Sequence, residues 1–209
     1  MLSTKPSMNE FEIAPSVTNA DWQRLNLSPT SQKTDWEVAV GMFQKRIDRF
    51  LEPIRALMQS SDLAIIVHVG FATMALDCLL VETLQSFRTG RPNPEKANDR
   101  LSTQAFVDFL TQRSAFKTYF DEPKAKLFYD HFRCGILHQG EVKSSGLIRK
   151  DTLIMVSPSR DNQSFIINRT LFHEALAKEV DEYKQELIEG KDVTLRDNFI
   201  KKMNEISRV

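Results

Sequence analysis

The spacing of apolar residues predicts a first long helix that begins near residue 34. Apolar side chains recur there at steps of three and four residues: Val40, Phe43, Ile47, Phe50, Leu51, Ile54 and Met58. This period places them on one face of a helix. Thr34 and Glu37 have the spacing of a capping box, so the helix should start there. Pro53 predicts a kink, because proline lacks a backbone donor and crowds the preceding turn.

The next stretch, residues 62–87, is apolar nearly all round, which is typical of a helix at the centre of a bundle. Its run LAIIVHVGFATMALDCLLV is long enough to raise the question of a membrane span. His68 and Asp77 interrupt the run, and an acid at bilayer depth costs about 2.5 to 3.5 kcal/mol. We therefore expect a buried central helix and no membrane association.

Two further helices are expected after a loop over residues 88–99, which is rich in helix breakers. The shorter one spans roughly residues 102–113. The other begins at DEPK, where Asp121 or Glu122 should serve as the N-cap. It ends where Gly140 can adopt the left-handed conformation of a C-cap.

The period then changes from that of a helix to that of a strand. The segments TLIMVS (152–157) and SFIINR (164–169) are rich in β-branched residues, and the turn-forming PSRDNQ separates them. They predict a β-hairpin. Helical periodicity returns over about residues 170–188 and, more weakly, from 194. The expected fold class is mainly all-α: a helical bundle with a small β-hairpin inserted before the last long helix.

The expected organisation is one domain with an N-terminal appendage. Residues 1–33 are rich in Ser, Thr, Pro, Asn and Gln, which predicts a partly flexible arm that lies on the core or on a partner. Residues 34–209 should form a single helical domain, with the hairpin at about 152–169 and C-terminal helices at about 170–207. A chain of 209 residues is long enough to bury a substantial core.

Composition and charge exclude several classes of protein. With 41% hydrophobic and 27% charged residues, the chain is neither wholly disordered nor a fibrous repeat. The 28 basic residues balance 28 acidic ones, so the molecule as a whole is not a general nucleic-acid binder. Residues 111–150, however, hold eight basic against four acidic residues, which predicts either a local basic patch or a solvated face.

The cysteines and the N-terminus indicate a reducing compartment. Cys78 and Cys134 lie in apolar or helical runs without the spacing of a zinc site, so neither a metal nor another cofactor is expected. The N-terminal segment lacks the apolar core of a secretory signal. We expect a cytoplasmic protein.

One stretch carries chemistry that a helical scaffold does not require. In FYDHFRCGILHQGEVK, residues 128–143, Arg133 and His138 bracket four small or apolar residues near the predicted end of a helix. FRCGILH resembles the Arg-x4-6-His motif of the HEPN superfamily, helical domains named for their occurrence in higher eukaryotes and prokaryotes with nucleotide binding. The order of apolar helices around the motif is also similar, and the likeness covers about residues 35–189.

The resemblance implies a stand-alone, metal-independent endoribonuclease, with a role as a toxin or defence effector and with an antitoxin or another protein as a partner. HEPN domains pair, so that the motifs of two subunits face each other across a groove, and Arg133 and His138 are the implied catalytic residues. The family often has Asn, Asp or His directly after the arginine. This chain has Cys134 there, so the site is either weaker or assisted by a residue from elsewhere.

Elementary chemistry favours the same residues. Cleavage of RNA without a metal requires a proton to leave the 2′-hydroxyl, charge on the phosphorane to be stabilised, and a proton to reach the leaving 5′-oxygen, which yields a 2′,3′-cyclic phosphate. Histidine titrates near neutrality, and a guanidinium can bind two phosphate oxygens. One chain supplies one of each. A two-fold homodimer would supply one histidine as base and one as acid.

Helix geometry raises an objection to this site. At about 100° per residue, Arg133 and His138 would point about 140° apart on an α-helix. They converge only if the helix loosens after Gly135 or if the long arginine side chain swings round. His138 should also face the negative end of the helix dipole, which favours the protonated form that suits a general acid.

Each candidate residue also has a structural interpretation. Arg133 could form an ion pair with Asp130, and His138 could cap exposed carbonyls. Glu82 and Asp77, the acids of the apolar helix, either support the pair by hydrogen bonding to Arg133 or His138 or are tied elsewhere, Glu82 for instance to Arg88.

The remaining polar candidates are weaker. Lys143 and Arg149 would contact RNA phosphates or simply be solvated. His131 is expected at the surface, and Arg169 is expected to be structural. His173 begins HEALA, which lacks the second histidine of a zinc-protease helix, so no metal site is expected there.

Three functions remain open at this point. The first is the homodimeric ribonuclease. The second is a HEPN-like dimerisation module without catalysis, which binds RNA, a nucleotide or a protein partner. The third is a helical scaffold, in which Arg133 and His138 lie on unrelated faces of a monomer.

Overall fold

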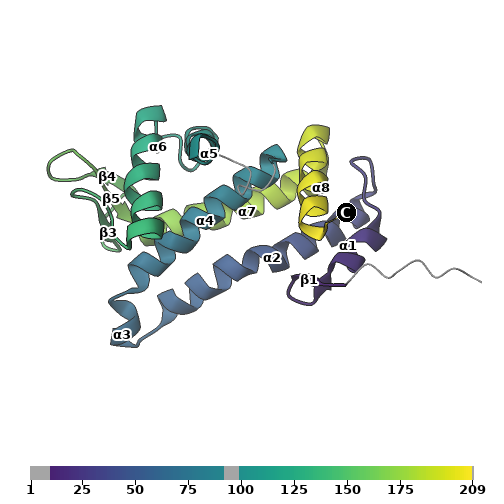
Figure 1. Cartoon of the computed structure of the whole chain (residues 1–209), viewed down its shortest axis with the longest axis horizontal. Coiled ribbons are helices and arrows are strands. Elements are labelled where there is room, and N and C mark those ends of the chain that lie inside the picture. The colour runs from purple at the N-terminus through teal and green to yellow at the C-terminus, as the bar shows by residue number, and fades with distance from the viewer. Residues whose placement is uncertain (1–9, 92–98, 209) are drawn as a thin grey trace, which may run out of the picture. The chain divides into compact units, whose positions relative to one another are not determined.

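A computed structural model describes residues 10–91 and 99–208. The chain is mainly helical, as predicted, with two small sheets. Figure 1 labels its helices and strands. The chain divides into two compact units, which are described separately. The first unit comprises residues 1–49, 87–92 and 184–209, and the second unit comprises 50–86 and 93–183.

The first unit contains the N-terminal elements. β1 (Glu12–Ala14) and β2 (Val17–Thr18) pair in antiparallel fashion, and α1 (Asn19–Leu25) follows directly. The Thr18 side chain accepts a hydrogen bond from the Asp21 N–H while Asp21 binds back to the Thr18 N–H, which completes a capping box. These elements lie in the segment for which an arm is predicted. Residues 1–9 of that arm lie outside the described residues.

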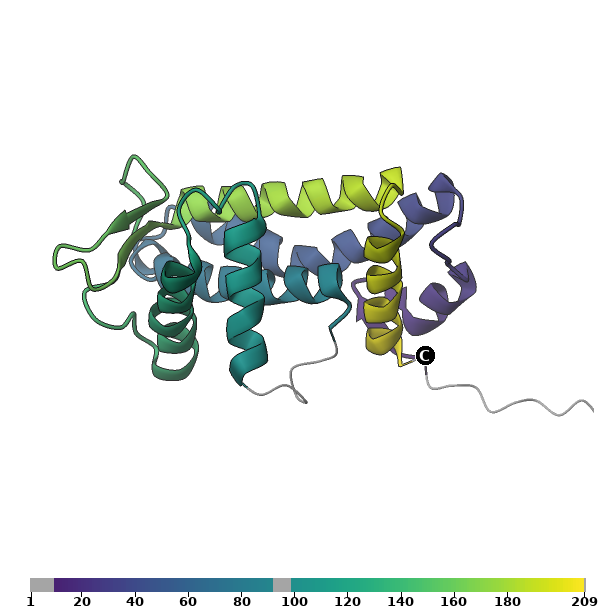
Figure 2. The ribbon, with the colours of Figure 1, turned by 90° about the horizontal axis from the view of Figure 1, so that it is seen from above.

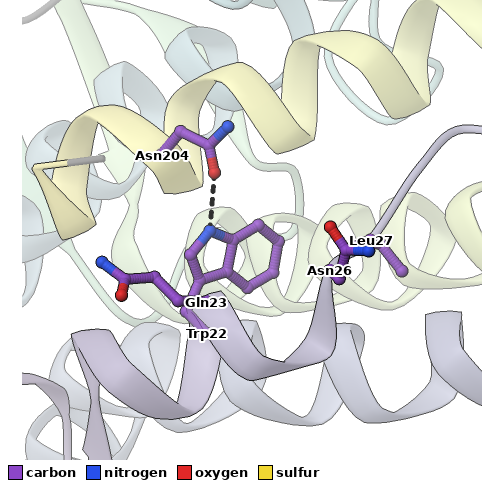
Figure 3. A pocket seen from close by; sticks show the side chains of 5 residues that line it. All are labelled: Trp22, Gln23, Asn26, Leu27 and Asn204. Atoms are coloured by element: carbon purple, nitrogen blue, oxygen red, sulfur yellow. Dashed lines mark hydrogen bonds between the residues drawn. The ribbon is translucent and has the colours of Figure 1, made fainter. Parts of the chain in front are cut away.

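Aromatic side chains fill the core of the first unit. Phe199, on α8 (Val193–Ser207), contacts four other rings at centroid distances of 5.6 to 6.0 Å: Trp22, Trp36, Phe43 and Phe87. Trp22 also donates from Nε1 to Asn204 Oδ1 at 2.7 Å (Figure 3). The indole N–H of the buried Trp22 therefore has a hydrogen-bond partner.

The first long helix, α2 (Lys33–Gln59), contributes residues to both units. Its predicted inward positions Val40, Phe43 and Ile47 are buried. The helix begins at Lys33, one residue before the predicted Thr34, and the Asp35 and Trp36 N–H groups both donate to the Gln32 carbonyl. The helix continues beyond Pro53 to its end at Gln59.

The second unit departs from the helix predicted over residues 62–87. That helix is interrupted: α3 (Leu63–Ile66) ends before Val67, and α4 (Val69–Thr89) begins after His68. The apolar residues are also not all buried. Exposed apolar side chains follow one another at steps of four and eight residues: Leu63, Val67, Phe71 and Leu79. In the described part of the chain, no helix is long and apolar enough to cross a membrane.

Two neighbouring helical segments follow α4 in the second unit (Figure 2). α5 (Asp99–Gln112) packs against α6 (Glu122–Phe128), whose N-cap is Asp121, as predicted. Phe128 stacks on Phe132 at 5.0 Å and on Phe172 of α7 (Arg169–Glu189) at 5.4 Å. The chain then continues from α6 as a π-helix, η2 (Tyr129–Gln139), where an α-helix was expected.

The predicted hairpin is present, but it belongs to a larger sheet. β4 (Val156–Pro158) and β5 (Phe165–Asn168) pair in antiparallel register, with Val156 opposite Ile167. β3 (Leu147–Arg149) pairs in parallel with β5, so the strand order is β3-β5-β4. The sequence analysis missed β3 because three residues are too few to show a period.

Candidate active site

The π-helix brings Arg133 and His138 together. In a π-helix the backbone hydrogen bond joins residues five apart, so such residues lie on successive turns of one face. Arg133 and His138 have this spacing, and Arg133 Nη1 lies 3.0 Å from His138 Nε2. The separation of about 140° expected for an α-helix therefore does not apply.

Gly135 and Gly140 allow the chain to turn sharply at the C-terminal end of the π-helix. Gly140 has φ = +68° and donates its N–H to the Gly135 and Ile136 carbonyls, as expected for its C-cap position. The Glu141 N–H also donates to the Gly135 carbonyl at 3.2 Å. A Cβ at Gly135 would lie 2.5 Å from the Glu141 carbonyl oxygen, so only glycine permits this approach.

Glu82 of α4 holds the arginine of the pair. Arg133 Nε donates to Glu82 Oε1 at 2.8 Å, and both side chains are only 16% exposed. Burial opposes the charge of the guanidinium, but the hydrogen bond and charge of Glu82 outweigh it and raise the pKa of Arg133. Arg88, the alternative partner of Glu82, pairs instead with Glu186.

The contact with Arg133 defines the role of one ring nitrogen of His138. A guanidinium has only donors, so in this hydrogen bond His138 Nε2 is the acceptor. His138 is exposed, whereas Arg133 is half-buried, so solvent reaches the imidazole side of the pair.

Tyr129 is a further member of the site that the sequence analysis did not identify. The Arg133 guanidinium carbon lies 5.4 Å from the centre of the Tyr129 ring, one helical turn earlier, which is a cation–π distance. Burial raises the pKa of Tyr129, and Cys134 and Thr103 lie close to its hydroxyl. An aromatic residue four positions before the arginine was the available signal.

Asp77 pairs with His173 and not with Arg133 or His138. Its Oδ1 accepts from His173 Nδ1 at 2.9 Å, and it is fully buried, with Oδ2 lacking a hydrogen-bond partner in the structure as described. Burial raises the pKa of Asp77 to about 6, although the hydrogen bond and charge of His173 lower it.

His131 corrects another expectation. It is buried and not at the surface, with Nδ1 3.0 Å from Ser164 Oγ, next to β5. The Lys143 N–H donates to the His131 carbonyl at 3.1 Å, so this residue fixes the chain that leaves the π-helix.

The two cations expected to contact RNA each have an acidic neighbour. Lys143 Nζ lies 2.7 Å from Asp130, which was the alternative partner of Arg133, and Arg149 donates twice to Asp151 at 3.0 Å. All four side chains reach solvent. Such exposed pairs are weak, so an anionic strand could displace the carboxylates.

No group of three or more His, Cys, Asp or Glu side chains suited to a metal is present within residues 10–91 and 99–208. A scan against models of protein families, a search of curated proteins and a search of solved structures found no match to this chain.

Proposed function

We propose that the chain is a metal-independent endoribonuclease of the HEPN type that acts as a homodimer. The observation that carries the proposal is the linked set Glu82–Arg133–His138, in which a half-buried carboxylate holds a guanidinium against an exposed imidazole. A structural ion pair needs only the first two residues. The third adds a proton acceptor at the solvent-facing end.

Each side chain has a role in the proposed reaction. A phosphate that binds Arg133 takes the place of His138 Nε2 as acceptor, which frees this nitrogen to remove the 2′-hydroxyl proton. The 2′-oxygen then attacks phosphorus, and Arg133 stabilises the phosphorane. The protonated His138 of the second subunit donates to the 5′-oxygen as the bond to phosphorus breaks, leaving a 2′,3′-cyclic phosphate and a 5′-hydroxyl. Glu82 is a positioning residue.

The exposed apolar residues of α4 support self-association. Phe71, Leu79 and Glu82 fall within about 80° of one another at 3.6 residues per turn, so the apolar surface runs toward the carboxylate that holds Arg133. Phe71 is 41% and Leu79 37% exposed. A two-fold contact along this face would bury them and bring two copies of the pair near each other.

The phosphate contacts of the proposed substrate come from Lys143 and Arg149, which exchange Asp130 and Asp151 for the RNA backbone. The proposed role of the protein is that of a toxin or defence effector, which a protein partner such as an antitoxin neutralises.

A second candidate is a HEPN-like dimerisation module that binds RNA, a nucleotide or a protein without cleaving anything. One observation favours it: Arg133, Lys143 and Arg149 all have partners within the chain. A binding site of low net charge does not need a free guanidinium.

Incubation of the purified chain with mixed RNAs in EDTA tests the proposal. We expect cleavage by the wild type and its loss in Arg133→Ala and in His138→Ala. His68→Ala and Arg55→Ala are matched controls, because both residues are exposed and lie outside the linked set. A wild type that cuts nothing would favour the binding module, and equal cutting by all variants would exclude these residues as catalytic.

A further inference from the structure

A polar pocket lies in the second unit, and it shares no residue with the linked set Glu82–Arg133–His138. It has a volume of about 140 Å³ and lies between the end of α2, the α3–α4 turn and the start of α7. Its polar lining consists of Ser60, Lys150, Arg169 and Thr170, and its apolar wall includes Ile66 and Val69. We propose that this pocket binds the phosphate group of a phosphate monoester.

Arg169 is the main reason for the proposal. Within the described residues its guanidinium has neither an ion pair nor a hydrogen bond, and its Nε is buried without a partner. Burial lowers the pKa of Arg169, and no acidic group offsets the effect. A desolvated charge without a counter-charge is costly, so a ligand anion would remove an existing penalty.

The position of the Arg169 guanidinium is constrained by its surroundings. A Cβ at Gly70 would lie 3.0 Å from Arg169 Nη1 and 3.1 Å from the Ile148 side chain, so the guanidinium packs closely against the first turn of α4. Gly70 supplies the space by having no side chain. An arginine held in this way loses little conformational entropy when it binds an oxyanion.

Lys150 adds a second positive charge to the same pocket. Its ammonium has no hydrogen bond or ion pair in the part of the chain that the structure describes, and the nearest acidic residue in the sequence, Asp151, is engaged by Arg149. Lys150 is exposed and Asp151 lies within its electrostatic reach, so Arg169 is the cation that lacks an acidic partner. Together the two cations match the charge of a phosphate monoester better than that of a carboxylate.

The two helix termini at the pocket are both N-termini, so both present the positive end of a helix dipole. α4 begins at Val69 and α7 at Arg169, each has 21 residues, and neither carries an acidic residue in its first turn. The positive ends of both helix dipoles are therefore not offset by a carboxylate of their own first turn. The Asn168 side chain already accepts from the Thr170 and Leu171 N–H groups. The pocket therefore relies on the two side-chain cations and the dipoles more than on free backbone donors.

The apolar wall indicates what the phosphate is attached to. Ile66 and Val69 would contact a ring or sugar carbon, whereas inorganic phosphate would leave them unused. A nucleoside monophosphate and the 5′-phosphorylated end of an RNA strand share this chemistry. The proposal does not depend on ribonuclease activity.

Calorimetric titration of the full-length chain at constant ionic strength tests the site. We expect saturable binding of AMP, weaker binding of inorganic phosphate and none of adenosine. Arg169→Gln and Lys150→Gln should each raise the Kd for AMP at least about tenfold, as expected for the loss of a charge-assisted hydrogen bond. Arg160→Gln, which alters an exposed arginine outside the pocket, should leave the Kd unchanged.

A second pair of titrations identifies the source of the phosphate. A 2′-O-methyl trinucleotide cannot be cleaved, and it is compared with and without a 5′-phosphate. Tighter binding of the phosphorylated trinucleotide than of AMP indicates a strand end, and tighter binding of AMP indicates a free nucleotide. Equal affinity for AMP and adenosine overturns the proposal. So does unchanged AMP binding by an Arg169→Gln variant whose circular dichroism and urea midpoint show that it is folded.

Discussion

Arg133 Nη1 lies 3.0 Å from His138 Nε2, across one turn of a π-helix. On an α-helix these two residues would point to different sides, so the wide turn itself creates the pair. π-helical geometry is rare and is found frequently at functional sites. Residues Tyr129–Gln139 continue it over 11 residues, well beyond a single bulge.

Gly135 should be essential for this wide turn. Gly135→Ala places a methyl group 2.5 Å from the Glu141 carbonyl oxygen, which is backbone and can move only if the turn opens. We expect a loss of about 1 to 3 kcal/mol in the free energy of unfolding, measured by urea denaturation. Gly41→Ala is the control. A Cβ there meets nothing within 4 Å in the middle of α2, so it should stabilise by up to about 1 kcal/mol.

Glu82 should act on the reaction through Arg133 alone. In Glu82→Ala the half-buried guanidinium loses its carboxylate, and RNA cleavage should fall by about 10- to 100-fold, the cost of a misplaced catalytic group. Glu82→Gln keeps an acceptor for Arg133 Nε and should restore part of the rate. The initial rates of Glu174→Ala, an exposed acid on α7, provide the reference. Equal rates for the alanine and glutamine variants would show that position 82 does not orient Arg133.

Asp77 should make stability fall as the pH rises. Its pKa is about 6 in the folded chain against 3.8 for the free group, so between these values the folded state holds the proton more tightly. The stabilising effect is complete below about pH 4 and is lost as the pH rises to about 6. The upper limit is about 3 kcal/mol.

Urea denaturation between pH 4 and 7 measures this effect. Asp77→Asn carries no titrating group, so its decline over this window should be smaller than that of the wild type. Parallel curves for the two proteins would contradict the assignment.

Phe71 should be needed for self-association. Phe71→Glu puts a charge on the exposed apolar face of α4, so a dimer formed through this face should dissociate, as measured by light scattering after size-exclusion chromatography. Cleavage should be lost together with the dimer. Val38→Glu changes an apolar residue in the first unit that is 52% exposed, against 41% for Phe71, and should leave both properties intact. A Phe71→Glu protein that remains dimeric would place the contact elsewhere.

Local patterns predicted much of the helical framework. Asp121 caps α6, Gly140 ends η2 with a positive φ, and five of the seven apolar positions predicted for the inner face of α2 are buried: Val40, Phe43, Ile47, Leu51 and Ile54. The hairpin of β4 and β5 also follows from two β-branched runs separated by a turn. These features depend on hydrogen bonds and apolar spacing within a few residues, and such short-range preferences can be read directly along a chain.

Other features depend on contacts between distant segments. The interruption at Val67 and His68 and the partner of β3 gave no periodic signal. The pairing of Asp77 with His173 joins residues 96 positions apart. An acid in an apolar helix predicts that a hydrogen-bond partner is needed, but only the packing of the chain determines which residue that partner is.

The candidate site shows the same division. The sequence selected Arg133 and His138 through their resemblance to the Arg-x4-6-His motif, and the chemistry of metal-free RNA cleavage favoured the same two residues. Only the structure decided that they touch, because Tyr129–Gln139 forms a π-helix, in which residues five apart lie on one face. In the sequence, Glu82 and Asp77 were two equivalent acids of an apolar helix. The structure places Glu82, and not Asp77, against Arg133. Side-chain chemistry is local, whereas the distance between two side chains belongs to the whole fold.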